Sequence, residues 1–436
     1  MSTANKLSYL NDTKSLLRTS LNKFGSSILS TDTFRSYDTK LNEIYDKLPK
    51  VTGSGSEFTL IPVQNGQVDD FKMNGVDLEQ SETPTPDSPQ EIKVVEGRQV
   101  ITDKGKNLFD VSQTPHSDNI TSAGVTLNIN DDGTISTSGT NTETYRNIRY
   151  DIQLQAGEYI ISGCPTGGSK NGYSSLVQLT NETSSQVFDT GSGATFSLQE
   201  TTTVKFYPVR VGSDTVNFNG LIFKPMIRLS NISNDTFEPY YEPVSYNIDL
   251  QLENIYLAKM PNTTYKNRIY KNNGNWYFEE NVRKYIIDGT ESWTTQSAYS
   301  GYYRYMFVLM ENYKNDNLSY GVVGMNSHFI QRITQPHGDY EYLYLQAANN
   351  NLLSVYIQIK NLSTIANFKT WLSENNVVVW YVLANPVTTQ ITNTTLINQL
   401  EAISVHTGTN IITISNDNNI IPEIEITRLK ELEKLA

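Results

Sequence analysis

From about residue 106 onward, turn-forming residues recur at short intervals, and the segments between them are apolar or alternate between apolar and polar side chains. Asp131-Asp132-Gly133 separates the alternating segment 125–129 from another that begins at Ile135. Asn272-Asn273-Gly274 separates a second pair of such segments. Asp-Gly and Asn-Gly dipeptides supply the positive φ angles of two-residue hairpins. About eight such strands without helices between residues 106 and 240, two of them expected at 202–211 and 215–227, are typical of an antiparallel β-sandwich or jelly roll. A short helix is expected later, at 363–374.

The composition agrees with a mainly β protein and excludes several other classes. The 436 residues include 27 Tyr, a residue that favours half-buried strands. Hydrophobic residues make up 37% and charged residues 18%, which excludes a disordered polyampholyte. The longest apolar run, 377–384, is far shorter than the ~18 residues of a membrane-spanning helix. A net charge of −12 argues against nucleic-acid binding, and a single cysteine excludes an internal disulfide.

The first fifty residues differ from the rest of the chain. Apolar side chains recur there at intervals of three and four, which predicts an α-hairpin of two amphipathic helices and no secretion signal. Helices this short need a partner for their apolar stripes. We expect this segment to anchor the chain to a larger particle or to oligomerise it; a helical cap on the protein's own β body is the alternative. The stripe residues are Leu7, Leu10, Leu17, Leu21, Phe24, Phe34, Tyr37, Leu41, Ile44 and Leu48.

The pattern predicts β-sandwich domains in tandem. Residues 52–56 predict a flexible hinge, and prolines at Pro84, Pro86 and Pro89 predict an extended spacer that crosses a surface. We therefore expect an N-terminal helical segment, a Gly/Ser- and Pro-rich linker with short strands, a β-sandwich, a second β-rich domain and a C-terminal strand and helix. Their predicted limits are 1–50, 51–100, 101–243, 244–395 and 396–436.

The sequence offers little for catalysis or metal binding. The four histidines have no partner at metal-ligand spacing, and no nucleophile or phosphate-loop motif occurs. Asp288 and Glu291 could form a glycosidase pair, but the Gly-Thr between them is also typical of a tight turn. Asp131 and Asp132 could hold calcium, but no third ligand has suitable spacing. We therefore predict no catalytic residue, no metal and no cofactor, and a structural role for Cys164.

Tyrosines near Gly, Ser and Arg are the remaining functional signal. A rigid aromatic ring with hydrogen-bonding groups beside it binds the apolar C–H face of a sugar. The alternative is that these tyrosines line a sandwich core or a subunit interface. The candidate carbohydrate-binding residues are Tyr145, Tyr150, Tyr173, Tyr302 and Tyr303.

Several phrases resemble one family. MSTANKLSYLNDTKSLL at 1–17 and TDTFRSYDTKLNEI at 31–44 resemble the helical opening of structural proteins from phages that infect Gram-positive bacteria. SETPTPDSPQEIKVVEG, GKNLFD, GLIFKPMIRLSN and FEPYYEP resemble phrases that bracket a carbohydrate-binding-module-like jelly roll in tail, fibre and baseplate proteins of these phages. WYFEENVRKYIIDGTESW and FKTWLSENNVVVWYVLANPVTTQI resemble their distal β part.

The resemblance implies a non-enzymatic virion protein that attaches the particle to host-envelope carbohydrate. It implies a homo-oligomer, a trimer in this family, joined to other phage structural proteins through residues 1–50 and bound to a host cell-surface glycan. Such a protein assembles in the host cytoplasm, which agrees with a single cysteine, and is then exposed on the virion without membrane insertion. A purely structural decoration, such as a head fibre or collar component, and a polysaccharide depolymerase are the alternatives.

Overall fold

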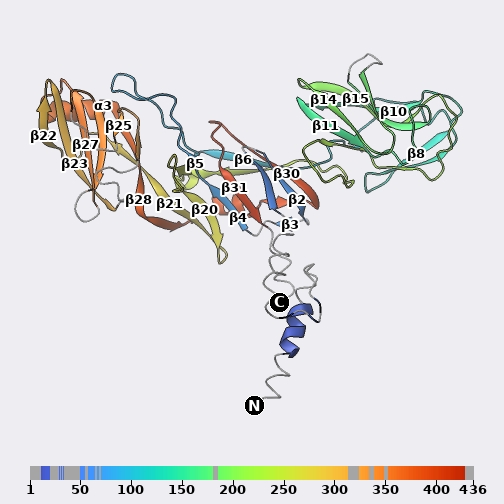
Figure 1. Ribbon diagram of the computed structural model, residues 1–436, viewed down its shortest axis with the longest axis horizontal. Coiled ribbons are helices and arrows are strands. Elements are labelled where there is room, and N and C mark those ends of the chain that lie inside the picture. The colour runs from blue at the N-terminus through green and yellow to red at the C-terminus, as the bar shows by residue number, and fades with distance from the viewer. Residues whose placement is uncertain are drawn as a thin grey trace, which may run out of the picture.

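A computed structural model gives the fold, and within its described residues the protein is mainly β, with antiparallel sheets in tandem and few helices, as predicted (Figure 1). Two short strand pairs, β19–β5 and β25–β26, are parallel. A helix covers residues 11–19, whereas the second predicted N-terminal helix and the closing helix lie outside the described part. The described residues are 11–19, 29, 31, 33, 50–54, 57–63, 66–67, 70–179, 185–312, 324–332, 338–347 and 352–427.

The centre of the molecule is a platform that segments from both ends of the chain build together. Its first sheet has the order β1-β2-β30-β6-β18, and its second contains β31, β4 and β20 side by side. Ile101, Ile412 and Phe71 belong to the core between them. The platform elements are β1 (Lys50–Ser54), β2 (Glu57–Val63), β3 (Gly66–Gln67), β4 (Asp70–Asn74), β5 (Val76–Asp77), β6 (Arg98–Gly105), β18 (Val244–Asp249), η3 (Leu250–Glu253), β19 (Ala258–Lys259), β20 (Arg268–Asn272), α4 (Thr394–Glu401), β29 (Ser404–Val405), β30 (Gly408–Asn416) and β31 (Glu423–Thr427).

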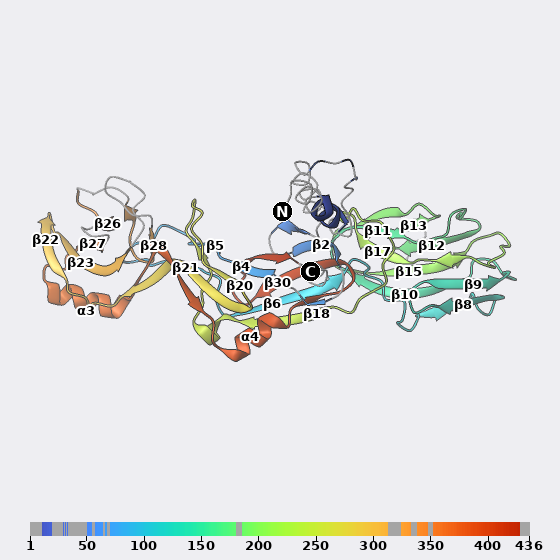
Figure 2. The same cartoon turned by 90° about the horizontal axis from the view of Figure 1, so that it is seen from below.

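A β-sandwich is inserted between β6 and β18, and Figures 1 and 2 show it on one side of the platform. Its five-stranded sheet has the order β13-β12-β15-β10-β7, and two three-stranded sheets, β14-β11-β17 and β16-β9-β8, complete it. The fold is compatible with a jelly roll. Its strands are β7 (Ser117–Asp118), β8 (Val125–Ile129), β9 (Ile135–Gly139), β10 (Asn147–Leu154), β11 (Gly157–Ser162), β12 (Tyr173–Gln178), β13 (Gln186–Asp189), β14 (Ala194–Leu198), β15 (Thr202–Val211), β16 (Ile222–Phe223) and β17 (Met226–Leu229).

A second insertion, the distal unit, lies on the opposite side of the platform (Figures 1 and 2). Two long strands, β21 (Asn275–Ile287) and β28 (Val377–Gln390), pair along most of their length and connect the platform to it. Its five-stranded sheet has the order β22-β23-β27-β26-β25. The other elements are β22 (Thr294–Tyr299), β23 (Tyr302–Asn312), β24 (Gly324–Asn326), β25 (Gln331–Arg332), β26 (Tyr342–Ala347), β27 (Leu352–Lys360) and α3 (Ile365–Asn375).

Local sequence explains the hairpins and helices. Asn273 and Gly274 have φ angles of 49° and 80°, as the predicted hairpin between β20 and β21 requires. Asn393 caps α4, because its side chain accepts hydrogen bonds from the amides of Thr395 and Leu396. Leu400 is buried one turn beyond Leu396, so the apolar side of α4 packs on the platform core.

The structure pairs segments that the sequence pattern assigned to different units. The hinge predicted at 52–56 is wrong, because residues 52–54 belong to β1 and pair with β2. Within the predicted linker 51–100, β2 and β6 each pair with β30, near the C-terminal end of the chain. The Pro-rich segment connects the platform to the distal unit, since the amide of Gln90 donates to the carbonyl of Ser327 at 2.8 Å.

Figure 1 shows the N-terminal helix below the platform. Leu16 is 70% exposed and Leu17, one of the predicted anchoring residues, is 42% exposed. The other predicted anchoring residues lie outside the described residues. No helix in the described part of the chain has the length and apolar character needed to cross a membrane.

Candidate functional site

The outer surface of the five-stranded sandwich sheet carries a row of aromatic and aliphatic side chains. Side chains alternate across a strand, so a residue faces outward when its neighbours along the strand point into the core. Leu176 on β12 lies directly between Phe188 on β13 and Tyr207 on β15 in the strand register. Val177 and Phe206, the adjacent residues, belong to the sandwich core. Phe188, Leu176 and Tyr207 therefore form one continuous row on the outer side of the sheet, in which Phe188 is half-buried, Tyr207 is 9% exposed and Leu176 is 2% exposed.

Polar and charged residues flank this row on one side. Lys205 on β15 pairs with Gln178 on β12 and with Asp151 on β10. The hydroxyl of Tyr207 donates to Oε1 of Gln178 at 3.1 Å, which links the row to its flank. Planar polar groups of this kind present hydrogen-bonding atoms at fixed positions.

On the other side of the row lies Arg210. It pairs with Ser174 and with Asn147 in the register of β15. Its Cζ lies 5.2 Å from the centroid of the Phe188 ring, and Nζ of Lys170 lies 5.0 Å from the same centroid. Both distances are within the range of a cation–π interaction. Nη1 of Arg210 also donates to the carbonyl of Lys170 at 3.0 Å, which fixes its orientation.

A bulge in β15 explains why Tyr207 points outward while Phe206 and Val209 both point into the core. The register of β15 shifts against both β12 and β10 near Pro208. Proline cannot donate to the sheet, and within strands it is found at edges and bulges. Ser175 uses its hydroxyl to donate to the carbonyl of Pro208 at 2.8 Å.

This surface has more cationic than anionic side chains, whereas the whole chain has a net charge of −12. Arg149 pairs with Asp151, with Nε 3.1 Å from Oδ1, and Nδ1 of His116 lies 3.1 Å from Oδ2 of the same carboxylate. Burial lowers the pKa of the Arg210 guanidinium and raises the pKa of the Tyr207 phenol, and in each case burial is the largest cause of the shift. We call this surface the sandwich face. Its residues are Arg149, Asp151, Lys170, Leu176, Gln178, Phe188, Lys205, Tyr207 and Arg210.

The sandwich face holds four cations and one carboxylate in a chain whose net charge is −12. Its aromatic rings are half-buried or nearly buried, so they are rigid. Rigid rings beside fixed hydrogen-bond donors suit a polyhydroxylated ligand, because its C–H groups pack on the rings while its hydroxyls accept from the cations.

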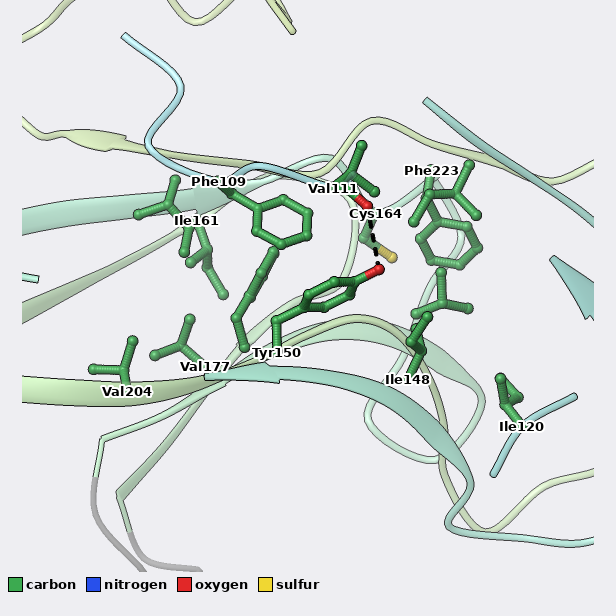
Figure 3. Close-up of a cluster of buried hydrophobic side chains, with 14 of the residues drawn as sticks. Phe109, Val111, Ile120, Ile148, Tyr150, Ile161, Cys164, Val177, Val204 and Phe223 are labelled. Atoms are coloured by element: carbon green, nitrogen blue, oxygen red, sulfur yellow. Dashed lines mark hydrogen bonds between the residues drawn. The ribbon is translucent and has the colours of Figure 1, made fainter. Parts of the chain in front are cut away.

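Two of the predicted tyrosines lie in or against the sandwich core. The prediction that Tyr150 is an exposed sugar platform is wrong, because it is only 2% exposed among Phe109, Val111 and Ile148 (Figure 3). Its hydroxyl donates to the carbonyl of Val111 at 3.4 Å, and burial raises its pKa to about 12. Tyr173 is half-buried against the same core, and its hydroxyl donates to the carbonyl of Thr166 at 2.8 Å.

The other three predicted tyrosines are placed differently. Tyr145 is 62% exposed, with a φ angle of 54°, and lies close enough to Arg210 to interact with it electrostatically, at the margin of the sandwich face. Tyr302 and Tyr303 belong to the distal unit. Nζ of Lys360 lies 5.7 Å from the ring centroid of Tyr302, whereas Tyr303 packs against the distal core.

Phe188, Tyr207 and Arg210 were not predicted from the sequence. The strand 202–211 was expected, but its alternation fails at Pro208, so the side of the sheet on which Tyr207 lies could not be assigned. Proline inside a strand pattern is the one local signal that indicates a bulge there.

The possible catalytic groups have structural roles. Glu291 is buried and accepts from the amide of Gly289 and from Nε1 of Trp293, while Asp288 accepts from Thr290 within the same turn. Burial raises the pKa of Cys164 to about 12, which leaves the thiol protonated and unreactive at neutral pH. Among the described residues, no group of three or more His, Cys, Asp or Glu side chains could hold a metal ion.

Comparisons with family models, with curated proteins and with solved structures found no match to this chain. The geometry of the sandwich face is therefore the basis for its functional interpretation.

Proposed function

We propose that the protein is a non-enzymatic virion appendage, of the tail-fibre or baseplate type, that attaches a phage to carbohydrate of the host envelope. The observation that carries the binding role is the sandwich face, where the Phe188–Leu176–Tyr207 row is flanked by Lys205 and Gln178 on one side and by Arg210 on the other. The phrases that resemble tail, fibre and baseplate proteins support the virion role.

The chemistry of the sandwich face favours a sugar over an apolar ligand. Phe188 offers a half-buried ring, and Arg210 and Lys170 lie over it as donors. A pyranose bound there would pack its C–H groups against the accessible part of the Phe188 ring and donate its hydroxyls to Gln178 and Asp151. An anionic substituent on the sugar would gain from the excess of cations.

The N-terminal helix supports a role in assembly. Leu16 and Leu17 are exposed on this helix, and a partner that packed on them would bury apolar surface. A trimer joined to the virion through residues 1–50 would hold several sandwich faces on one particle, so that weak individual contacts add up to stable attachment.

A purely structural decoration is the second candidate. The observation that favours it is that the sandwich face is internally paired, since Tyr207 bonds to Gln178 and Arg149 pairs with Asp151. Such pairing stabilises a surface without any ligand.

Binding of the purified full chain to host cell walls separates these two functions. We expect saturable binding that falls at least tenfold in the double variant Phe188→Ala/Arg210→Ala. The matched control is Arg268→Ala/Tyr270→Ala. It removes a similar cation–aromatic pair on the platform, in which Cζ of Arg268 lies 5.0 Å from the ring centroid of Tyr270. Absence of binding by the unaltered chain, or equal binding by both variants, contradicts a receptor role for the sandwich face.

A further inference from the structure

The sandwich joins the platform at a neck, where the chain leaves β6 and returns toward β18. Lys106, the first residue after β6, is fully buried at this neck. Its Nζ lies 2.9 Å from Oε1 of Glu238, on the returning segment, and donates to the main-chain carbonyl of Asn234 at 3.1 Å. An amine, a carboxylate and an asparagine therefore meet at the neck, where Lys106 is fully buried and Asn234 and Glu238 are half-buried.

The side chain of Asn234 contacts the same carboxylate oxygen. Its Nδ2 donates to Oε1 of Glu238 at 3.2 Å, so one oxygen touches both the lysine amine and the asparagine amide nitrogen. Oδ1 of Asn234 accepts from the main-chain amide of Thr236 at 3.1 Å. A donor at that position stabilises negative charge that develops on the amide oxygen when a nucleophile attacks the amide carbon.

The platform holds Glu238 in this position. Thr409 donates from its amide to Oε2 at 2.7 Å and from its hydroxyl to Oε1 at 2.9 Å. A Cβ at Gly408 would meet Oε2 at 2.6 Å, so the platform backbone approaches the carboxylate as closely as glycine allows. The carboxylate is thus placed by residues outside the sandwich.

Lys106 has the properties of a nucleophile. Burial lowers the pKa of its ammonium group, against the opposing effect of Glu238, which increases the fraction of neutral amine. Lysines with lowered pKa values in buried sites act as nucleophiles and general bases.

We propose that Lys106 and Asn234 become joined by an intramolecular isopeptide bond, with Glu238 as the proton shuttle. The ammonium of Lys106 gives a proton to Glu238, and the free amine attacks Cγ of Asn234. The tetrahedral intermediate places its charge on Oδ1, opposite the amide of Thr236. Glu238 carries protons from Nζ to Nδ2, the Cγ–Nδ2 bond breaks, and ammonia leaves. One amide replaces another, so the reaction needs no oxidant and no co-reactant.

Such a bond would close the whole sandwich insertion at its base. The two residues are 128 positions apart, and a cross-link over a loop of this length restricts the unfolded chain strongly. A chain with one cysteine cannot obtain that restriction from a disulfide within itself. An isopeptide bond is also insensitive to the redox state of the compartment.

Mass spectrometry of the unaltered full chain tests the proposal without any substitution. The denatured protein is expected to be lighter than its sequence by one molecule of ammonia. Trypsin is expected to leave the bond after Lys106 uncut and to release a branched peptide that contains both Lys106 and Asn234. Full sequence mass together with complete cleavage after Lys106, in protein whose thermal unfolding is cooperative, overturns the proposal.

Variants then assign the roles. Lys106→Arg keeps the cation but cannot form the bond, and Glu238→Gln keeps the shape of the shuttle but cannot carry protons, so both are expected to retain full mass. The control Lys104→Arg, two residues earlier on β6, is expected to lose ammonia as the unaltered chain does. Loss of ammonia in Lys106→Arg would show that another residue is modified and would contradict the assignment.

Discussion

The sandwich and the distal unit each contain a five-stranded sheet with one side packed on a hydrophobic core and with aromatic and cationic side chains on the other side. In the distal sheet, Tyr356 on β27 pairs with Tyr344 on β26, and their ring centroids are 5.8 Å apart. Nη1 of Arg304 lies 3.4 Å from the hydroxyl of Tyr342. The two outward surfaces therefore use the same residue types.

The two surfaces differ in what covers them. Tyr342 and Tyr344 are each only 1% exposed, although they point away from the distal core. Gln358, beside them, donates from Nε2 to the carbonyls of Gly338 and Tyr340, so a loop is tied across that surface. On the sandwich face, Leu176 is 2% exposed and Tyr207 is 9% exposed, and the half-buried Phe188 is the most accessible member of the row. The two surfaces therefore differ in the accessibility of Phe188 and of the cations beside it.

The largest expected effect is a loss of stability when a residue on the core-facing side of β15 is replaced. Phe206→Ala removes a fully buried ring that packs edge-on against Phe109, with centroids 4.7 Å apart. We expect the free energy of unfolding of the sandwich to fall by ~3–5 kcal/mol. Tyr207, at the adjacent position, is 9% exposed, so Tyr207→Ala should also lower the free energy of unfolding, by less than Phe206→Ala, and should in addition weaken cell-wall binding. Calorimetry and binding measurements on both variants check this, and weaker binding in Phe206→Ala with unchanged binding in Tyr207→Ala would contradict the assignment of sides.

The second prediction compares the stability and binding of variants at aromatic residues on the two outward surfaces. Tyr344→Ala leaves a cavity under covering chain, and we expect it to lower the free energy of unfolding of the distal unit by about 2–4 kcal/mol without altering binding. Phe188→Ala on the sandwich face should change stability by less than about 1 kcal/mol, because the ring is only half-buried, and should weaken binding. A binding defect in Tyr344→Ala would show that the distal surface is also a site.

Acid is expected to weaken the distal unit before the sandwich. Burial lowers the pKa of His328 below its ordinary value of 6.5, and Nδ1 lies 2.7 Å from Oγ of Ser327. The unfolded state binds the proton more tightly, so stability is complete above pH ~6.5 and falls as the pH drops from there toward the lowered pKa of the folded state. His328→Gln should flatten the dependence of melting temperature on pH between 7 and 5. An unchanged pH dependence in His328→Gln would show that the imidazole of His328 does not cause the loss of stability in acid.

The smallest effect concerns the carboxylate of the sandwich face. Asp151→Asn removes the partner of Arg149 and His116, both at the surface. Surface ion pairs contribute about 0–1 kcal/mol, so melting should hardly change. If the ligand is anionic, binding should strengthen slightly and lose more affinity on addition of salt. Weaker binding would instead indicate that Asp151 accepts a hydrogen bond from a neutral sugar.

Much of the fold was predictable because it is encoded locally. The strand expected at 202–211 is β15, and the hairpin turns at Gly133 and Gly274 are present. The helix expected at 363–374 is α3, which begins after its cap Thr364. The strand expected at 215–227 was wrong, since residues 215–221 contain only an isolated bridge and a turn, and the rest is divided into β16 and β17 by Lys224 and Pro225.

The candidate site was less predictable, because a tyrosine looks the same in sequence whether it faces a core or solvent. Tyr150 was expected on the surface and is part of the core, whereas Tyr207 was not selected and belongs to the sandwich face. A single extra residue at the bulge near Pro208 reverses the side on which every following side chain lies. Only the pairing with β12 and β10 fixes that register.

The sequence alone determined the class of the protein: antiparallel strands, tight turns and a distinct helical opening, all of which depend on neighbours a few residues apart. The tertiary structure decided which strands share a sheet, which aromatic rings remain accessible and which residues meet at the neck. Lys106 and Glu238 are brought together there, although 131 intervening residues form a domain of their own. Such contacts follow from the burial of the whole core, and no local pattern contains them.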